Sequence, residues 1–402
     1  MPARGGGLRG KRPQGKRVLR KEASIARQFQ ANLAPITHSS HALPSPLARL
    51  TLTNRMRRVD VCGQLPEISV VPDKSEFTAE NIVISVLGGI AAALIFAVVT
   101  RGGAGGLMLA HLAPLPIMII ALGYGVRHGA SAALLATAIL SVYPHPVVGM
   151  VYAVMVAGPA WLACYAASGA PRGRRDFITS NFPGWAALAP AVVIALTVSL
   201  WLIVATLSFG SLDDALNPIR ARAFIVLDEM IKENKSLEGK LDPVALSGSV
   251  AMAVPAFIAS YTVMLHIVNL WIAGRLTLAS GLLTRPWPDI AEGFRLPKFV
   301  GAVFLSGLAL SLFNGPSAAV GYVLVASMGL ILSFQGLAVA HARLRDRRNG
   351  MIMLAIMYFV VGLLGWPLVL FVLIGMTDLI VDVRSRKTPI PGPGQNSASK
   401  PD

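Results

Sequence analysis

Charged residues are scarce in this sequence: only 14% of its 402 residues are Asp, Glu, Lys or Arg, against about 25% in ordinary soluble domains. Hydrophobic residues make up 54%, which excludes an ordinary soluble protein. Cysteine is scarcer still, since Cys62 and Cys164 are the only two. Their wide separation excludes a disulfide framework, a C-x-x-C pair and a cysteine-based zinc site.

The common catalytic signatures are also missing. The sequence contains no H-E-x-x-H, no G-x-S-x-G and no G-x-x-x-x-G-K-[ST] motif. The glycine-rich run 101–106 has no Lys-Ser/Thr after it, so it predicts a hairpin turn rather than a phosphate loop. We therefore expect no enzymatic activity, no cofactor and no metal ion.

Long apolar stretches are what the sequence has instead. A run of about 20 apolar residues is long enough to cross a bilayer as a helix. We predict an all-α polytopic transmembrane bundle with eight spans, at about residues 81–99, 107–123, 129–142, 147–167, 185–207, 244–272, 299–313 and 318–339.

The last apolar run, 351–381, contains one charged residue, Asp378. A helix of its 31 residues would be about 46 Å long, which exceeds a hydrocarbon core of about 30 Å. Gly365-Trp366-Pro367 lies near the middle, and proline breaks or kinks a helix. Two alternatives remain, a pair of short helices that turn at Gly365 or one kinked helix. Basic residues on both flanks favour the pair, because the positive-inside rule then keeps both flanks on one side.

The formal net charge of +16 predicts membrane topology rather than nucleic-acid binding. The first 80 residues hold about half of this excess, with 14 Lys/Arg and six Asp/Glu. Most of the rest lies in loops that the positive-inside rule assigns to the cytoplasm, and only Arg101 departs from that assignment. Residues 211–242 carry seven acids and five bases, so we place them outside. We predict a cytoplasmic amino terminus and no nucleic-acid partner.

The chain divides into three regions. Residues 1–78 are rich in Gly, Pro, Ser and Arg and lack apolar periodicity, so we expect a disordered basic extension. Residues 79–386 form the transmembrane domain, and 387–402 form a disordered tail. Segment 211–242 is predicted to contain an extracytoplasmic amphipathic helix that lies on the membrane or caps the bundle. Its apolar face consists of Leu216, Ile219, Ala223, Leu227, Met230 and Ile231.

Several of these features resemble a known family. The carboxyl-terminal residues that carry the resemblance are Gln335-Gly336-Leu337-Ala338, His341, Tyr358, Gly365-Trp366-Pro367, Gly375, Asp378 and Arg384. The amino-terminal ones are Leu112-Ala113-Pro114-Leu115-Pro116 and Gly123-Tyr124-Gly125. Over about residues 80–386 the chain resembles the YybS-like family, bacterial membrane proteins with a domain of unknown function. That family in turn resembles the substrate-binding S components of energy-coupling-factor vitamin transporters. The resemblance implies a bacterial inner-membrane location and carries over no catalytic residue.

Two interpretations of the amino-terminal extension stay open. Residues 1–58 contain thirteen basic residues and one acid, Glu22, a composition typical of transit peptides, but no sustained amphipathic helix accompanies it. The alternative is an over-extended translation start, with the protein beginning at Met56 or a later codon. The bacterial resemblance favours the second interpretation.

Polar side chains inside the predicted spans are the candidate ligand-binding residues, because lipid offers them no partner. Thr262, His266 and Asn269 are spaced i, i+4 and i+7, so they share one face of the sixth span. They either face a ligand or hydrogen-bond neighbouring helices.

Three further candidates lie in other spans. Asp378 either pairs with an Arg or His, relays protons, or lies at the interface near Arg384. His111 lies beside the Pro114/Pro116 break, where backbone groups freed by proline are tolerated only inside protein or along a cavity; the alternative places it near the headgroups. Gln335 either contributes to a site or joins helices.

We predict a small-molecule binding or permease subunit similar to the S components. Broken helices and a polar stripe near mid-membrane support this prediction, since transport sites lie there. With no ATPase sequence in this chain, a partner or an ion gradient would supply the energy. The alternative is a non-catalytic scaffold for envelope or division machinery. The expected partners are the lipid bilayer, a small-molecule ligand and another membrane protein.

Overall fold

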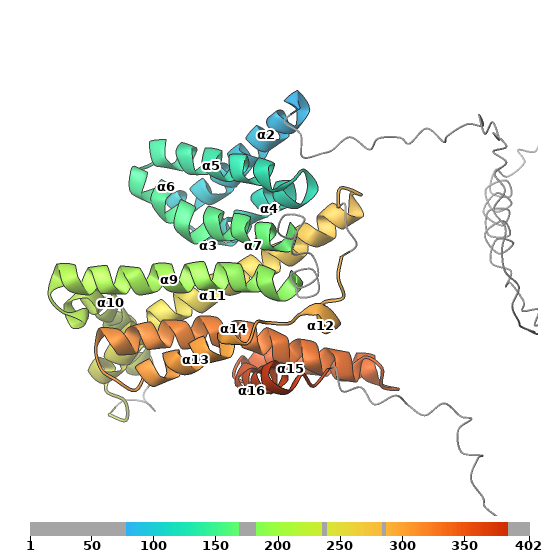
Figure 1. Cartoon of the computed structure of the whole chain (residues 1–402). Coiled ribbons are helices and arrows are strands. Elements are labelled where there is room, and N and C mark those ends of the chain that lie inside the picture. Colours follow the sequence, from blue (N-terminus) through green and yellow to red (C-terminus); the bar gives the residue numbers. More distant parts are fainter. Residues whose placement is uncertain (1–77, 169–181, 235–238, 284–286, 385–402) are drawn as a thin grey trace, which may run out of the picture. The chain divides into compact units, whose positions relative to one another are not determined.

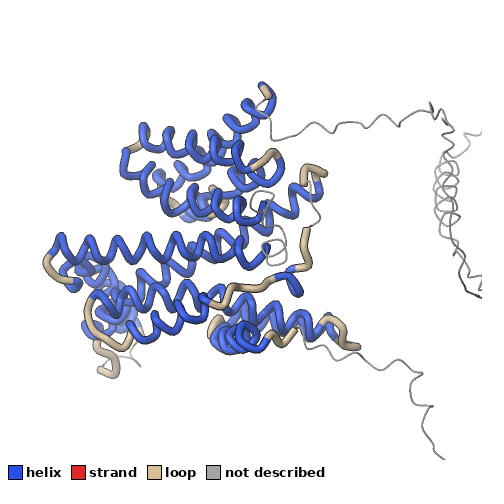
Figure 2. The backbone as a smooth tube through the Cα atoms, in the orientation of Figure 1, coloured by secondary structure: helices blue, strands red, loops and turns tan. Residues whose placement is uncertain are grey.

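The computed structural model describes residues 78–168, 182–234, 239–283 and 287–384. Helices are the only regular secondary structure in these ranges (Figure 2), so the predicted all-α class is confirmed. The predicted disordered extension, the disordered tail and the arginine-rich loop after the fourth span lie outside the described residues.

The first group of helices is repeatedly interrupted. Its elements are α2 (Ala79–Ala97), η1 (Val98–Arg101), α3 (Ala104–Ala110), α4 (Pro114–Gly123), α5 (Val126–Val142), α6 (Pro146–Tyr152), η2 (Ala153–Ala157) and α7 (Gly158–Ser168). The predicted break before Pro114 is confirmed, because α3 ends and α4 begins on either side of it. A second irregularity, which we did not predict, is η2, one π-helical turn between α6 and α7.

The second group contains the longest helices. Its elements are α9 (Phe182–Phe209), α10 (Leu212–Glu233), α11 (Pro243–Ala279), α12 (Ile290–Gly293), α13 (Phe299–Leu310), α14 (Pro316–Leu344), α15 (Gly350–Leu364) and α16 (Leu368–Val381).

Six helical segments are long and apolar enough to cross a membrane. They are Ala79–Ala97, Gly105–Gly123, Pro146–Ser168, Pro183–Phe209, Pro243–Ala279 and Pro316–Leu344. These segments coincide with six of the eight predicted spans. The other two fall on α5 and α13, which have 17 and 12 residues, so they are only about 26 and 18 Å long. The α13 helix is short because it starts after Pro297 and ends before the turn at Gly315, whose φ is 71°.

The predicted amphipathic helix is present as α10. The Ser211 hydroxyl accepts a hydrogen bond from the Asp214 N–H and caps its first turn. Leu212, Leu216 and Ile231 are buried, because α10 packs against α9 and α11. Part of its apolar face therefore packs on the bundle, whereas Met230 is 58% exposed.

Two hydrophobic cores hold the bundle together. One gathers buried side chains of α2, α4, α5 and α7, many of them alanines. The other gathers side chains of α9, α11 and α14. Figure 1 shows α9 and α11 between the first helices and the carboxyl-terminal ones, and both helices pack against α7 and α14. Of the six long apolar segments, α14 is the most enclosed, since 67% of its most apolar stretch is buried.

Glycines allow α14 and α16 to approach closely. A Cβ atom on Gly336 of α14 would collide with the carbonyl oxygen of Phe371, and one on Gly375 of α16 would collide with that of Leu332. Small residues permit such backbone contact between membrane helices. The pair therefore forms one tightly packed unit.

The carboxyl-terminal run consists of two short helices, as the favoured alternative predicts. The φ of Gly365 is 68°, a value that L-residues disfavour, and it ends α15 before α16 begins. Of the 15 residues of α15, only Gly350 is buried. A hydrogen bond of 2.9 Å between His341 Nδ1 and the Tyr358 hydroxyl links α15 to α14. Most of the α15 surface is thus left to contact lipid.

We expect Gly336→Ala to lower the free energy of unfolding by about 1–3 kcal/mol, because the added methyl group forces α14 and α16 apart. Gly362→Ala is the matched control, since no atom would lie within 4 Å of its Cβ. Unfolding of both variants in mixed micelles measures the difference. Equal stabilities of the two variants would contradict the close packing.

Candidate functional site

A buried ion pair joins α16 to the residues that follow it. Arg384 Nη2 donates to Asp378 Oδ2 over 2.7 Å, and the two side chains are only 1% and 2% exposed. Gln335 Nε2, from α14, donates to the same oxygen over 2.8 Å. The candidates Gln335 and Asp378 are therefore brought together, and Asp378 pairs with an arginine inside the protein.

Two of these three side chains, Arg384 and Gln335, also hold the segment that runs from α12 to α13. Arg384 donates to the carbonyl oxygens of Ala291 and Phe294, over 2.9 and 2.7 Å. Gln335 Oε1 accepts a hydrogen bond of 3.0 Å from the Leu296 N–H. This hydrogen-bonded set, which we call the Asp378 network, ties α14, α16 and the 291–296 segment together.

The Asp378 network is incompletely satisfied. Both Asp378 Oδ1 and Arg384 Nε are buried without a hydrogen-bond partner. Burying a charge pair carries a desolvation penalty that the Coulomb attraction offsets only with good geometry and further hydrogen bonds. The network therefore links α14, α16 and the 291–296 segment, and its two charged side chains are almost fully buried.

Exposed ion pairs surround the buried one. Arg345 pairs with Asp289 and Glu292, and Arg295 pairs with Asp382 over 2.6 Å. The hydrogen bond from Arg345, together with the N–H of Ala291, holds the pKa of Asp289 below its usual range. The sequence indicates a role for these arginines only in membrane topology, but in the structure they also hold the 289–296 segment in place.

A second polar group lies where α11 crosses the break between α3 and α4. The Tyr261 hydroxyl and His111 Nε2 are 3.0 Å apart. Asn269 Nδ2 donates to the carbonyl oxygen of His111 over 2.8 Å. The structure therefore brings the candidates His111 and Asn269 together, through a backbone carbonyl at the helix break. Asn269 Oδ1 is buried without a partner.

His266 contacts the π-helical turn. Its Nδ1 lies 2.8 Å from the Thr262 carbonyl oxygen, and its Nε2 lies 3.1 Å from that of Val156 in η2. A neutral imidazole has only one N–H, so both contacts are hydrogen bonds only when the ring is protonated. The Thr262 hydroxyl donates to the Ile258 carbonyl oxygen within its own helix. The polar stripe of α11 is thus engaged in contacts between and within helices.

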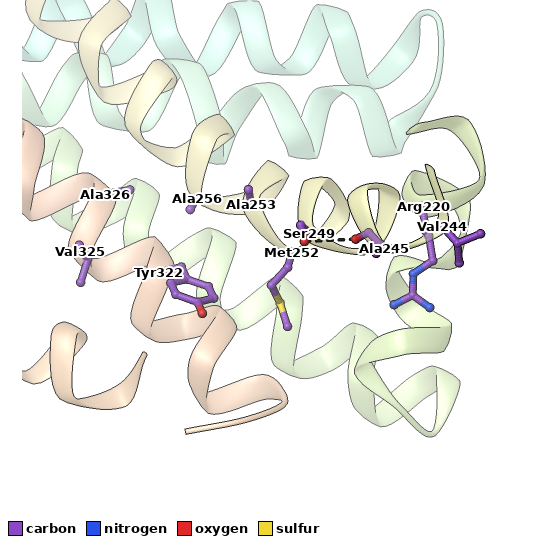
Figure 3. Close-up of a pocket in the computed structure, with 11 residues that line it drawn as sticks. Arg220, Val244, Ala245, Ser249, Met252, Ala253, Ala256, Tyr322, Val325 and Ala326 are labelled. Carbon is purple, nitrogen blue, oxygen red and sulfur yellow. Dashed lines mark hydrogen bonds between the residues drawn. The ribbon is translucent and has the colours of Figure 1, made fainter. Parts of the chain in front are cut away.

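A cavity of about 750 Å³ lies elsewhere, between α10, α11 and α14 (Figure 3). Its volume falls within the range of about 300–1,000 Å³ that is usual for ligand pockets. The residues that line it are Arg220, Val244, Ala245, Gly248, Ser249, Met252, Ala253, Ala256, Tyr322, Val325 and Ala326. None of the six candidate residues is among them.

Two signals in the sequence point to this cavity in retrospect. Small residues recur at helical spacing along α11, at Ala245, Gly248, Ala253 and Ala256. Arg220 lies within the predicted amphipathic segment. The sequence does not reveal that α10 folds back on α11, and therefore does not bring these two signals together.

No group of three or more His, Cys, Asp or Glu side chains that could hold a metal ion is found within the described ranges. The residues that line the cavity can bind apolar and hydrogen-bonding groups, and Arg220 adds one guanidinium.

We expect Asp378→Asn to destabilise the protein by about 3–5 kcal/mol, because it leaves the Arg384 charge buried and unpaired. Asp382→Asn is the control, since its partner Arg295 and its own side chain are partly exposed, and such pairs contribute about 0–1 kcal/mol. Unfolding in mixed micelles gives both values. The double variant Asp378→Asn/Arg384→Gln should recover part of the loss; if it is the least stable of all, the pair is not the cause.

The stability difference between the wild type and Asp289→Asn should depend on pH. The pKa of Asp289 is lowered in the folded state, so its contribution is fully present above the unfolded value of about 3.9 and is lost as the pH falls through the lower folded value. In Asp289→Asn the side-chain oxygen can still accept the hydrogen bond from the Ala291 N–H, so the substitution removes only the charge. Melting temperatures between pH 7 and pH 3 should therefore converge at the acidic end; a constant difference would contradict the ion pair with Arg345.

Comparison with known proteins gives one result. The family described as "Predicted membrane protein (DUF2232)" matches residues 89–379. No curated protein and no solved structure matches the chain. The matched range runs from α2 to α16 and contains the cavity, the second polar group and the Asp378 network except for Arg384, which follows the range. The chain is a member of the DUF2232 family of multi-helix membrane proteins.

Proposed function

We propose that this protein is a membrane-embedded binding subunit for a small molecule, of the kind that serves transport, and that its ligand occupies the cavity between α10, α11 and α14. The observation that carries the proposal is the cavity itself, with a volume of about 750 Å³ and a mostly apolar lining. Sites for small molecules usually combine an apolar wall with a few polar groups. Arg220, Ser249 and Tyr322 supply the polar groups here.

The position of the cavity fits this role. Two of its walls, α11 and α14, are among the six segments long enough to cross a membrane, so the cavity extends along the direction of crossing. The third wall, α10, lies over the start of α11 and is joined to α9 by a glycine with a φ of 85° at Gly210. A ligand that binds here is shielded by an amphipathic helix at one end.

The polar stripe of α11 has a supporting role in this proposal. His266 and Asn269 hold α11 against η2 and against the α3–α4 break, which fixes the helix that forms one wall of the cavity. Direct contact of Thr262, His266 and Asn269 with a ligand stays a prediction from the sequence. The similarity to S components stays one too, as do the inner-membrane location and the cytoplasmic amino terminus.

The scaffold function is the second candidate, and the exposure of α15 favours it. Met351, Phe359 and Leu363 are 86%, 69% and 68% exposed, so an extended apolar surface is available to another membrane helix. A scaffold would use this surface and would need no ligand in the cavity.

We expect Ala256→Phe to reduce co-purification of a small molecule at least about tenfold, a loss of about 1.4 kcal/mol, because the ring fills the cavity. Val254→Phe is the control, since Val254 lies on the same helix but does not line the cavity. Native mass spectrometry of protein extracted from its own membranes measures the bound fraction, and melting temperatures verify that both variants are folded. Equal occupancy in folded Ala256→Phe and in the control would place the ligand elsewhere, and no ligand in any sample would favour the scaffold.

A further inference from the structure

The cavity has a charged end and an apolar end. Figure 3 shows Arg220 beside Val244 and Ala245 at one end, with Ala256, Val325 and Ala326 at the other. The lining of α11 runs from Val244 to Ala256, which is about 18 Å along the helix axis. This length exceeds half of a hydrocarbon core of about 30 Å. The cavity thus has the proportions of a head-group site followed by a chain-binding groove.

Part of the Arg220 guanidinium is accessible to a ligand, because 35% of the side chain is exposed. Its Nη2 bonds Asp213 Oδ1, whereas its Nε is buried without a hydrogen-bond partner. A Cβ atom at Gly248 would lie 4.0 Å from this Nε, so the Nε rests over the glycine of α11. Because the side chain of Asp213 is 76% exposed, its ion pair is a weak surface pair. The guanidinium can therefore also bind an anion, for which its planar set of donors is well suited.

The rest of the cavity suits a hydrocarbon chain. Small residues of α11, three alanines and Gly248, line the cavity, and Val325 and Ala326 line it from α14. Small residues in membrane helices usually let a neighbouring helix come close, but here α11 and α14 leave a cavity at these positions. Val244, Ala253 and Tyr322 are exposed, so the cavity opens to the outer surface of α11 and α14. Both helices are long and apolar enough to cross a bilayer. The molecule that reaches it most readily is a lipid.

We propose that the ligand of this cavity is an anionic phospholipid of the surrounding membrane. Its phosphate lies against Arg220, and one acyl chain lies between α11 and α14 as far as Ala256 and Ala326. This inference rests on the proposed function, because it names the class of ligand for the same site. It adds a direction of binding, with the head group beside α10 and the chain toward the middle of α11.

The test is native mass spectrometry of the full chain, titrated with dimyristoyl phosphatidylglycerol and, separately, with dimyristoyl glycerol, which has the same chains and no phosphate. Arg220→Gln should weaken phosphatidylglycerol binding about tenfold to a hundredfold, as expected for a hydrogen bond to a charged group. It should leave diacylglycerol binding unchanged. Arg220→Lys should recover only part of the loss, because an ammonium group lacks the planar fork.

Arg222→Gln is the matched control, since Arg222 is exposed on the same helix and does not line the cavity. Equal losses in Arg220→Gln and Arg222→Gln would overturn the inference, because the lipid would then respond only to surface charge. Displacement of the lipid by inorganic phosphate alone would also overturn it, in favour of a soluble anion. Loss of both lipids in Ala256→Phe, with no effect of Arg220→Gln, would leave the proposed function standing without the anionic head group.

Discussion

The buried pair of Asp378 and Arg384 is the interaction on which the carboxyl-terminal part of the bundle depends. Arg384 follows α16, yet its guanidinium bonds the carbonyl oxygens of Ala291 and Phe294, which lie some ninety residues earlier. An isolated charge at this depth would be strongly destabilising, whereas the pair is tolerated because each partner has further hydrogen bonds. One interaction therefore connects the position of α16 with the course of the chain into α13.

A comparable relation links α11 to the interrupted helices. Backbone carbonyl groups at a helix break have no partner in lipid, so they must be satisfied within the protein. Asn269 donates to the carbonyl of His111 beside the α3–α4 break, and the ring of His266 contacts the carbonyl of Val156 in the π-helical turn. One continuous helix thus supplies polar side chains to two discontinuous ones, which explains why its polar residues share a face.

The sequence predicts the helices well because hydropathy is a local property. Six of the eight expected spans are long apolar helices, and the turn at Gly365 divides the last run as its glycine and proline indicate. The side-chain contacts between different helices are harder to predict. The sequence offers pairing with a base as one of three alternatives for Asp378, whereas its hydrogen bond with Gln335 depends on how α14 meets α16. The sequence does not predict the cavity for the same reason, since Arg220 and Gly248 come together only after α10 folds back over α11.

The exposure of α15 has a consequence for how this helix is accommodated in a bilayer. A helix of 15 residues extends about 22 Å, so it is shorter than a hydrocarbon core of about 30 Å, and a short apolar element is accommodated by local thinning of the bilayer or by tilting of its neighbours. Since α15 packs little against the bundle, few protein contacts besides the His341–Tyr358 hydrogen bond oppose a change in its depth. Bilayer thickness therefore acts more directly on α15 than on the enclosed α14.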